Sequence, residues 1–236
     1  MFDVVQDDAG PLERARAALR LAERRVGVQH RDQVVTVTPP APAPLTDLLP
    51  DGELPRGAVS SVLGPGPLPG SASLTCWLLG ATQGDRWIAV AGWPNLSPLA
   101  MTEAGVNLSR VMLVPDVQDQ GPAILAALIG GFETVVVGPR VQLTPSERRR
   151  LLARARQQET AVLSTSRWEG AALTLDVERS RWSGPDRGER WLREARLTVT
   201  RHSSVDGGGQ RFDVARSGTA SPTVIAARVA GVRLTG

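Results

Sequence analysis

The stretch Val59-Ser-Ser-Val-Leu-Gly-Pro-Gly-Pro-Leu-Pro-Gly-Ser-Ala-Ser73 joins a β-branched run to a loop rich in glycine and proline, and an apolar stretch over 74–81 follows it. A strand, a loop and a helix in this order are the setting in which a nucleotide-binding fold holds phosphate. We therefore expect an α/β fold in which this loop takes the place of the phosphate-binding loop.

The loop lacks the groups that would hold a phosphate. A phosphate-binding loop reads G-x-x-x-x-G-K-[ST], but Gly64 and Gly70 are one residue further apart and Ser71 takes the lysine position. Gly66 stands among three prolines, which have no N–H to donate. Hydrogen bonds to charged groups contribute about 1.5–3 kcal/mol each, so roughly 5 kcal/mol or more is lost, against about 8 kcal/mol for micromolar binding. We predict that the loop binds no nucleotide cofactor.

Composition narrows the class of protein further. All 27 basic residues are arginine, which the codon usage of a GC-rich genome explains, and 42% apolar residues among 236 suffice for one α/β domain with appendages. The single cysteine, Cys76, excludes a disulfide framework and falls in an apolar helical pattern, so we expect a buried thiol. His30 and His202 have no acidic or cysteine cluster at ligand spacing, so we expect no metal site. The sequence shows neither a secretion signal nor an apolar run near 18 residues, and we predict a cytoplasmic protein.

Charge is distributed unevenly along the chain. Residues 1–139 hold nine arginines and 14 acidic residues, a net charge of −5, whereas residues 140–236 hold 18 arginines and ten acidic residues, a net charge of +8. The basic half could meet nucleic acid or an acidic protein surface. An ordinary arginine-rich surface in contact with solvent explains it equally well.

The N-terminal segment has the pattern of an amphipathic helix. Leu12, Leu19 and Val26 lie on one seam over 11–28, with arginine and glutamate between them. Such a seam packs on its own domain, docks on another protein or mediates self-association. A short strand over 33–38 and a proline-rich stretch over 39–49 follow, and we interpret the latter as a linker.

The centre of the chain alternates short apolar runs with helical stretches. This alternation predicts a mostly parallel sheet flanked by helices. After Ala171 the pattern changes to strand-like runs separated by turns, which predicts antiparallel strands that extend the sheet. The expected strands are 59–63, 87–91, 111–114, 134–137, 161–164, 172–177, 195–201 and 211–215, and the expected helices are 74–82, 98–105, 122–132 and 145–159, the last starting at a capping box of Thr144 and Glu147. The expected parts are an N-terminal segment 1–38, a linker 39–50, an α/β core 51–216 and a tail 217–236 that either binds a partner or packs on the core.

Four stretches in order carry a resemblance to a known family. They are Leu54-Pro-Arg-Gly57 with the loop after it, Trp87-Ile-Ala-Val-Ala-Gly-Trp-Pro-Asn-Leu-Ser-Pro-Leu-Ala100, Ala104-Gly-Val-Asn-Leu-Ser-Arg-Val-Met-Leu-Val114, and Ala126-Ala-Leu-Ile-Gly-Gly-Phe-Glu-Thr-Val-Val-Val137. This series resembles the RecA-like recombinase core, and within it the ImuA-type accessory proteins of mutagenic DNA repair. The resemblance covers roughly residues 50–165 and implies a RecA-like α/β fold.

The chain departs from the recombinase pattern at each position of the chemistry. Gly92 and Trp93 stand where the resemblance places the catalytic glutamate, Gly138 stands in place of the Walker B aspartate, and Ser164 stands near the γ-phosphate-sensing glutamine. With the altered loop, these losses predict a pseudo-ATPase and no enzyme.

Three tryptophans lie in the arginine-rich second half. Trp168, Trp182 and Trp191 alternate with arginines, a composition found at protein interfaces, in sheet packing and in single-stranded nucleic-acid sites. The sequence leaves these three interpretations open.

The resemblance implies a scaffold in the DNA-damage (SOS) response. Such a protein would bind an ImuB-type inactive Y-family polymerase and an error-prone replicative-type polymerase in translesion synthesis, moving to the nucleoid on recruitment. The alternatives are a divergent nucleotide-dependent recombinase or regulator, and a single-stranded-DNA-binding module that uses the basic half.

Overall fold

The computed structural model describes residues 43–64, 70–184, 194–203, 209–218 and 220–229. These belong to the unit that runs from Pro39 to Gly236. The expected N-terminal helix with Leu12, Leu19 and Val26 lies outside the described residues, as do His30, Gly66 and Trp191.

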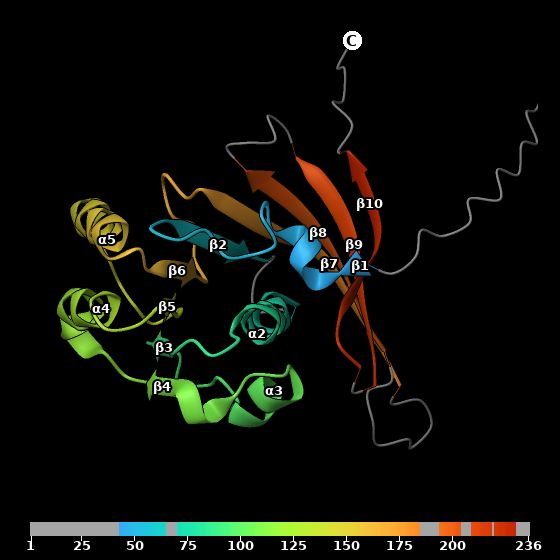
Figure 1. Cartoon of the computed structure of the whole chain (residues 1–236), viewed down its shortest axis with the longest axis horizontal. Helices are drawn as coiled ribbons and strands as arrows, with labels where there is room; N and C mark the ends of the chain where they lie inside the picture. The colour runs from blue at the N-terminus through green and yellow to red at the C-terminus, as the bar shows by residue number, and fades with distance from the viewer. Residues whose placement is uncertain (1–42, 65–69, 185–193, 204–208, 219, 230–236) are drawn as a thin grey trace, which may run out of the picture. The chain divides into compact units, whose positions relative to one another are not determined.

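Strands and helices alternate through the centre of the chain, and strands alone follow (Figure 1). The strands are β1 (Ala43–Pro44), β2 (Val59–Leu63), β3 (Ile88–Ala91), β4 (Val111–Val114), β5 (Thr134–Val137), β6 (Ala161–Ser164), β7 (Leu173–Ser183), β8 (Glu194–Ser203), β9 (Gln210–Ser217) and β10 (Thr223–Val229). The helices are η1 (Leu45–Leu48), α2 (Gly70–Thr82), α3 (Pro98–Glu103), η2 (Leu108–Arg110), η3 (Gln118–Gln120), α4 (Gly121–Ile129) and α5 (Pro145–Gln158).

All ten strands belong to one mixed sheet in the order β1-β10-β9-β8-β7-β2-β6-β5-β3-β4. The pairs from β7 across β2, β6, β5 and β3 to β4 are parallel. The pairs from β7 across β8, β9 and β10 to β1 are antiparallel. The α/β class with a mixed sheet is thereby confirmed, and the antiparallel strands extend the sheet from β7.

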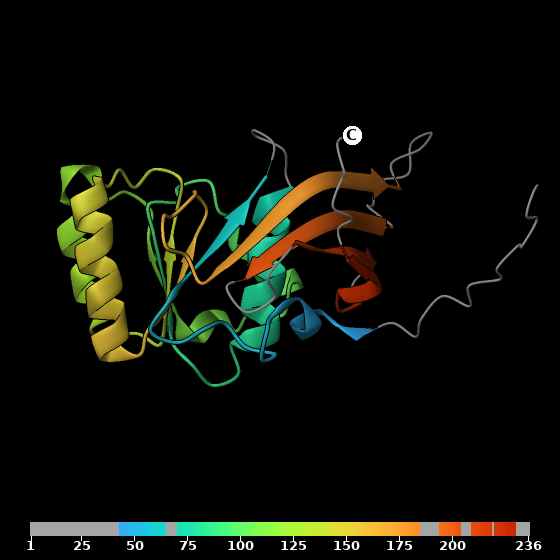
Figure 2. The same ribbon diagram turned by 90° about the horizontal axis from the view of Figure 1, so that it is seen from above.

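Helices cover both faces of the parallel strands (Figures 1 and 2). Helices α4 and α5 pack on one face, towards which Val135 and Val137 of β5 point. Helices α2, α3 and η1 pack on the other, towards which Val136 points, because side chains alternate along a strand. Among the described residues, the α4–α5 layer includes no side chain of β8, β9 or β10, so it covers only the parallel part.

Local sequence explains where two of the helices lie. The Thr144 hydroxyl accepts the backbone N–H of Glu147, and the Glu147 carboxylate accepts the backbone N–H of Thr144, so the predicted capping box of α5 is confirmed. In α2, the Cys76 side chain is buried as predicted, and burial raises the pKa of its thiol to about 11. A thiolate is therefore disfavoured there.

The structure differs from the sequence-based expectation at both ends of the described unit. Residues 43–49 of the expected linker belong to the fold, because Leu45 and Leu48 are buried and Arg201 donates to the carbonyls of Asp47 and Leu48. Within the expected tail, Thr223–Val229 pairs with β9 as a strand of the sheet.

Candidate functional site

The candidate nucleotide site lies where the parallel strands end. In an open α/β sheet, ligands bind outside the carboxyl ends of the strands. Ala91, Val137 and Ser164 are register partners across β3, β5 and β6, and Ser164 also pairs with Ser61 of β2. The structure therefore brings together three positions that the sequence singled out. They are Gly92, Gly138 and Ser164, and they lie at the carboxyl ends of neighbouring parallel strands.

The two glycines at this edge leave no room for a carboxylate. Gly138 donates its N–H to the Ala91 carbonyl at 2.8 Å, and Arg140 donates to the Gly92 carbonyl at 3.0 Å. A Cβ atom added to Gly138 would lie 2.5 Å from the Gly92 carbonyl oxygen and 2.8 Å from that of Ala91. Real Cβ atoms essentially never approach backbone so closely, so any side chain at residue 138 would displace the backbone.

Gly92 is constrained by the loop that follows β5. Its φ angle of +69° lies in the left-handed region, and an added Cβ would lie 2.4 Å from Cγ2 of Val141. The next residue, Trp93, packs against the α2 side of the core. Residues 92 and 138, just after β3 and β5, therefore accommodate no larger side chain without displacement of their neighbours.

Ser164 forms a local turn at the end of β6. Its side chain is fully buried, its hydroxyl donates to the Ser166 carbonyl at 2.9 Å, and it accepts the Ser166 N–H at 3.2 Å. Thr165 closes the same turn with a hydroxyl bond to the Val137 carbonyl at 3.1 Å. The Ser164 hydroxyl is thus already engaged within its own strand end.

The described part of the degenerate loop is packed closely. A Cβ at Gly64 would lie 3.2 Å from the Ser71 side chain, and one at Gly70 would lie 3.0 Å from Val177 and from Ser180 of β7. The start of α2 therefore abuts the first antiparallel strand.

A hollow of about 440 Å³ remains beside the loop. Arg167, Asp176 and Glu178 line it together with Gly64. Thr200 donates a hydrogen bond to Glu178, and this bond, with the positive charges of Arg211 and Arg179, holds the pKa of Glu178 below its ordinary value. Because Arg211 pairs with Glu178, the hollow carries charges of both signs.

The structure places two of the three tryptophans in packing positions. Trp168 is 4% exposed and lies beneath the Arg148 guanidinium, 5.3 Å from its ring centroid. Trp182 is partly buried, with its ring centroid 6.5 Å from that of Trp77 in α2. Of the three interpretations left open by the sequence, burial favours sheet packing for both.

An exposed apolar surface at the free edge of the sheet was not expected from the sequence. The large apolar side chains that are exposed by more than a third, among the described residues, are Trp87, Leu99, Leu108, Met112 and Leu113. We call these five side chains the β4 edge patch: Met112 and Leu113 lie on β4 and point to opposite faces of the sheet, Trp87 precedes β3, Leu99 lies in α3 and Leu108 in η2. An edge strand offers unpaired backbone groups with which another chain can pair.

The sequence held no signal for this patch, because β4 reads as the same short apolar run as the fully buried β5. The other candidates do not gather at the site: His202 is exposed on β8. No helix in the described ranges is both long and apolar enough to cross a bilayer.

The described residues define an α/β protein with one mixed sheet, in which glycines occupy residues 92 and 138 at the carboxyl ends of β3 and β5. The chain belongs to the family described as MT3502 N-terminal domain, whose sequence model matches residues 47–170. It is also similar to the uncharacterized protein Rv3395c of Mycobacterium tuberculosis (strain ATCC 25618 / H37Rv), with 34% identity over 134 residues. That similarity covers 55% of this chain and 63% of the relative. The family match runs from η1 past β6, so it spans the parallel strands and ends before β7.

Proposed function

We propose that this protein is a non-catalytic, RecA-like accessory protein of the ImuA type that acts as a scaffold in damage-induced mutagenic translesion DNA synthesis. Its partners would be an ImuB-type inactive polymerase and an error-prone replicative-type polymerase. It would work in the cytoplasm and join the nucleoid when recruited to damage.

The observation that carries the non-catalytic part is the packing of Gly138 against Gly92. Phosphoryl transfer needs carboxylates that hold Mg²⁺ and orient the nucleophile. A side chain at Gly138 would meet the Gly92 carbonyl oxygen at 2.5 Å, so the edge has no space for one. The three prolines and the serine in the lysine position of the loop support the same conclusion.

The scaffold part is supported by the surface of the molecule. The β4 edge patch gives the fold an apolar strand edge on which another protein can pair or pack. The RecA-like and ImuA-type part of the proposal rests on the sequence resemblance, which covers roughly residues 50–165.

Capture of an ImuB-type protein by the purified full chain tests the scaffold function. We expect retention by the wild type and loss on deletion of residues 1–30 or of residues 230–236. Deleting all of 217–236 would also remove β10 from the sheet, so the shorter deletion separates a docking tail from a structural strand. If wild type and both truncations retain nothing, the scaffold proposal is wrong.

The β4 edge patch can be tested in the same assay. Leu113→Glu places a charge on the exposed edge and should weaken capture, whereas Gln142→Glu, at another exposed position, should not. Equal capture by both variants would exclude the patch as the contact surface.

Calorimetry with Mg·ATP tests the loss of nucleotide binding. We expect no saturable heat, because the loop lacks the lysine and three N–H donors. Micromolar binding would instead favour the divergent recombinase or regulator. Affinity for single-stranded DNA that falls steeply with salt would favour a direct nucleic-acid role.

A further inference from the structure

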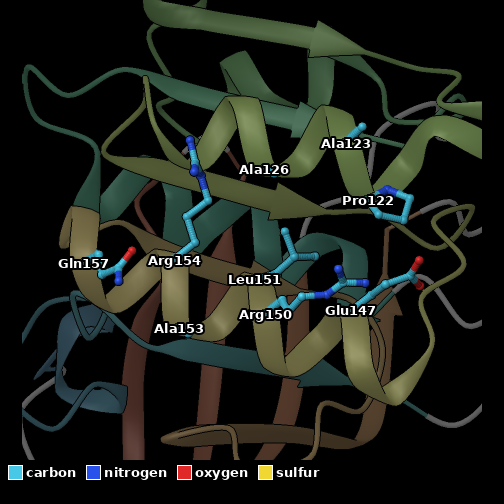
Figure 3. A pocket seen from close by; sticks show the side chains of 9 residues that line it. All are labelled: Pro122, Ala123, Ala126, Glu147, Arg150, Leu151, Ala153, Arg154 and Gln157. Atoms are coloured by element: carbon cyan, nitrogen blue, oxygen red, sulfur yellow. The ribbon is translucent and has the colours of Figure 1, made fainter.

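A groove of about 460 Å³ separates α4 from α5 (Figure 3). Its floor is apolar, with Pro122 and Ala126 on the α4 side and Leu151, which is 5% exposed, pointing between the helices from α5. Its volume falls within the range of ligand-binding pockets, about 300–1,000 Å³.

Two arginines of α5 border this floor. Arg150 and Arg154 lie on either side of Leu151, and the Arg154 side chain extends across towards α4 (Figure 3). There its Nη2 atom is 2.9 Å from where a Cβ of Gly130 would be, just past the last turn of α4. The two arginines are four residues apart, so they stand on the same helix face, about 6 Å apart along the axis.

Neither guanidinium forms an ion pair within the described residues, although the charge of Arg150 contributes to the lowered pKa of Glu147. The ion pairs formed there join other side chains and include neither Arg150 nor Arg154. Glu147 also lines the groove, but its carboxylate accepts hydrogen bonds from the backbone N–H and the hydroxyl of Thr144. The groove therefore combines an apolar floor with the two positive charges of Arg150 and Arg154 and the negative charge of Glu147 at one end.

We propose that the α4–α5 groove docks an acidic amphipathic helix of a partner protein. Such a helix would lay apolar side chains on Ala126 and Leu151 and place carboxylates four residues apart against Arg150 and Arg154. The lining extends along α5 from Glu147 to Gln157, about 15 Å of helix, so the docked segment has about ten residues.

The lining favours a peptide over a nucleic acid. Single-stranded nucleic acid is held by aromatic side chains on which bases stack and by a basic track along the backbone. No aromatic side chain is among the nine lining residues of this groove, and an apolar floor contributes nothing to a phosphate backbone. An acidic amphipathic helix uses both the floor and the charges.

The inference deepens the scaffold proposal and rests on it for its biological meaning, but its test needs no polymerase-like protein. A labelled synthetic helix of about 18 residues, with leucine on one stripe and glutamates four residues apart beside it, is titrated with the full chain by fluorescence anisotropy. We expect saturable binding, and weaker binding of a matched peptide with glutamine in place of glutamate.

Two double variants of α5 distinguish binding in the groove from attraction by the overall charge of the helix. Arg150→Glu with Arg154→Glu should weaken binding about tenfold or more, because each carboxylate of the peptide then meets a like charge. Arg149→Glu with Arg156→Glu changes the net charge equally at exposed α5 positions outside the lining, and binding should stay within about threefold. Equal weakening by both double variants would overturn the proposal.

A third variant tests the floor without changing charge. Ala123 is exposed at the groove, so Ala123→Trp fills it from the α4 side and should also reduce binding, with the circular dichroism spectrum unchanged. Absence of saturable binding to the wild type contradicts the proposal, as does unchanged binding of Ala123→Trp. Displacement of the peptide by a single-stranded oligonucleotide that depends on the same two arginines would assign the groove to nucleic acid. Capture of a polymerase-like partner by the wild type is measured separately, so failure of the groove proposal and failure of the scaffold proposal are distinguishable.

Discussion

The parallel strands β2 to β6 and the antiparallel strands β8 to β10 belong to one sheet but differ in how they meet solvent. Every residue of β3, β5 and β6 is buried, because helices cover both faces. In β8 and β9, buried residues largely alternate with accessible ones, since the α2 side alone contributes to the core there. The parallel strands other than the edge strand β4 are thus the most tightly enclosed region of the described unit.

This difference locates where function can reside. The carboxyl edge of the parallel strands is closed by backbone at Gly92 and Gly138, although such an edge is where α/β proteins bind ligands. What the parallel part offers to other molecules is its outer surface, at the β4 edge patch and the α4–α5 groove. The fold is consistent with a rigid support for docking surfaces.

The largest effect is expected from restoring an acid at the closed edge. Gly138→Asp should lower the free energy of unfolding by about 4 kcal/mol, because the new Cβ would overlap the Gly92 carbonyl and separate β3 from β5. Urea unfolding measures this loss. Gly131→Asp is the control, since a Cβ there has its nearest neighbour at 4.0 Å, and it should cost less than about 1 kcal/mol. Similar stability of the two variants would show that the edge has room for a carboxylate.

The next prediction asks whether the two parts of the sheet unfold together. Leu163 of β6 and Leu197 of β8 are 0% and 1% exposed and belong to the same core cluster. Leu163→Ala and Leu197→Ala should each cost about 3 kcal/mol. Because the cluster spans both parts, each variant should show one transition that coincides by tryptophan fluorescence and far-ultraviolet circular dichroism. Two separate transitions in either variant would mean that the antiparallel strands fold independently.

The sequence predicted the parallel part more accurately than the antiparallel part. The expected strands over 59–63, 111–114, 134–137 and 161–164 have the observed bounds, because short apolar runs there end at glycine, proline or polar residues. Strand β7 continues to Ser183, well beyond the expected end at 177, since its length is set by pairing with β8. Such pairing is a tertiary effect that local pattern does not encode.

The sequence predicted where the candidate site lies, but not that the backbone around it leaves no space for side chains. The sequence placed Gly92, Gly138 and Ser164 at strand ends, and the register brings them to one edge. The clash at Gly138 depends on the distance between β3 and β5, which are neighbours in space only. The β4 edge patch likewise depends on strand order, because the same apolar run is buried in the middle of a sheet and exposed at its edge.

A smaller effect is expected from the cap that starts α5. Thr144→Ala removes the hydroxyl that accepts the Glu147 N–H and should cost about 1 kcal/mol of stability. The loss should appear in thermal or urea unfolding of the whole unit, since α5 covers the parallel strands. Gln142→Ala, at an exposed position before the cap, should change stability by less than about 0.5 kcal/mol. If both variants behave alike, the capping box contributes nothing measurable.

The smallest effect concerns acid stability in the antiparallel part. The Thr200 hydroxyl and the Arg211 guanidinium hold the pKa of Glu178 below its ordinary value of 4.5. The unfolded chain binds this proton at higher pH than the folded one, so the stabilisation is complete above the unfolded pKa and is lost as pH falls through the folded pKa. Glu178→Gln does not titrate, so its melting temperature should fall less than that of the wild type between about pH 6 and pH 3. Thr200→Val removes the strongest of these contributions and should shift the profile partway towards that of Glu178→Gln. Superimposable profiles for the wild type and Glu178→Gln would show that protonation of Glu178 is not coupled to folding.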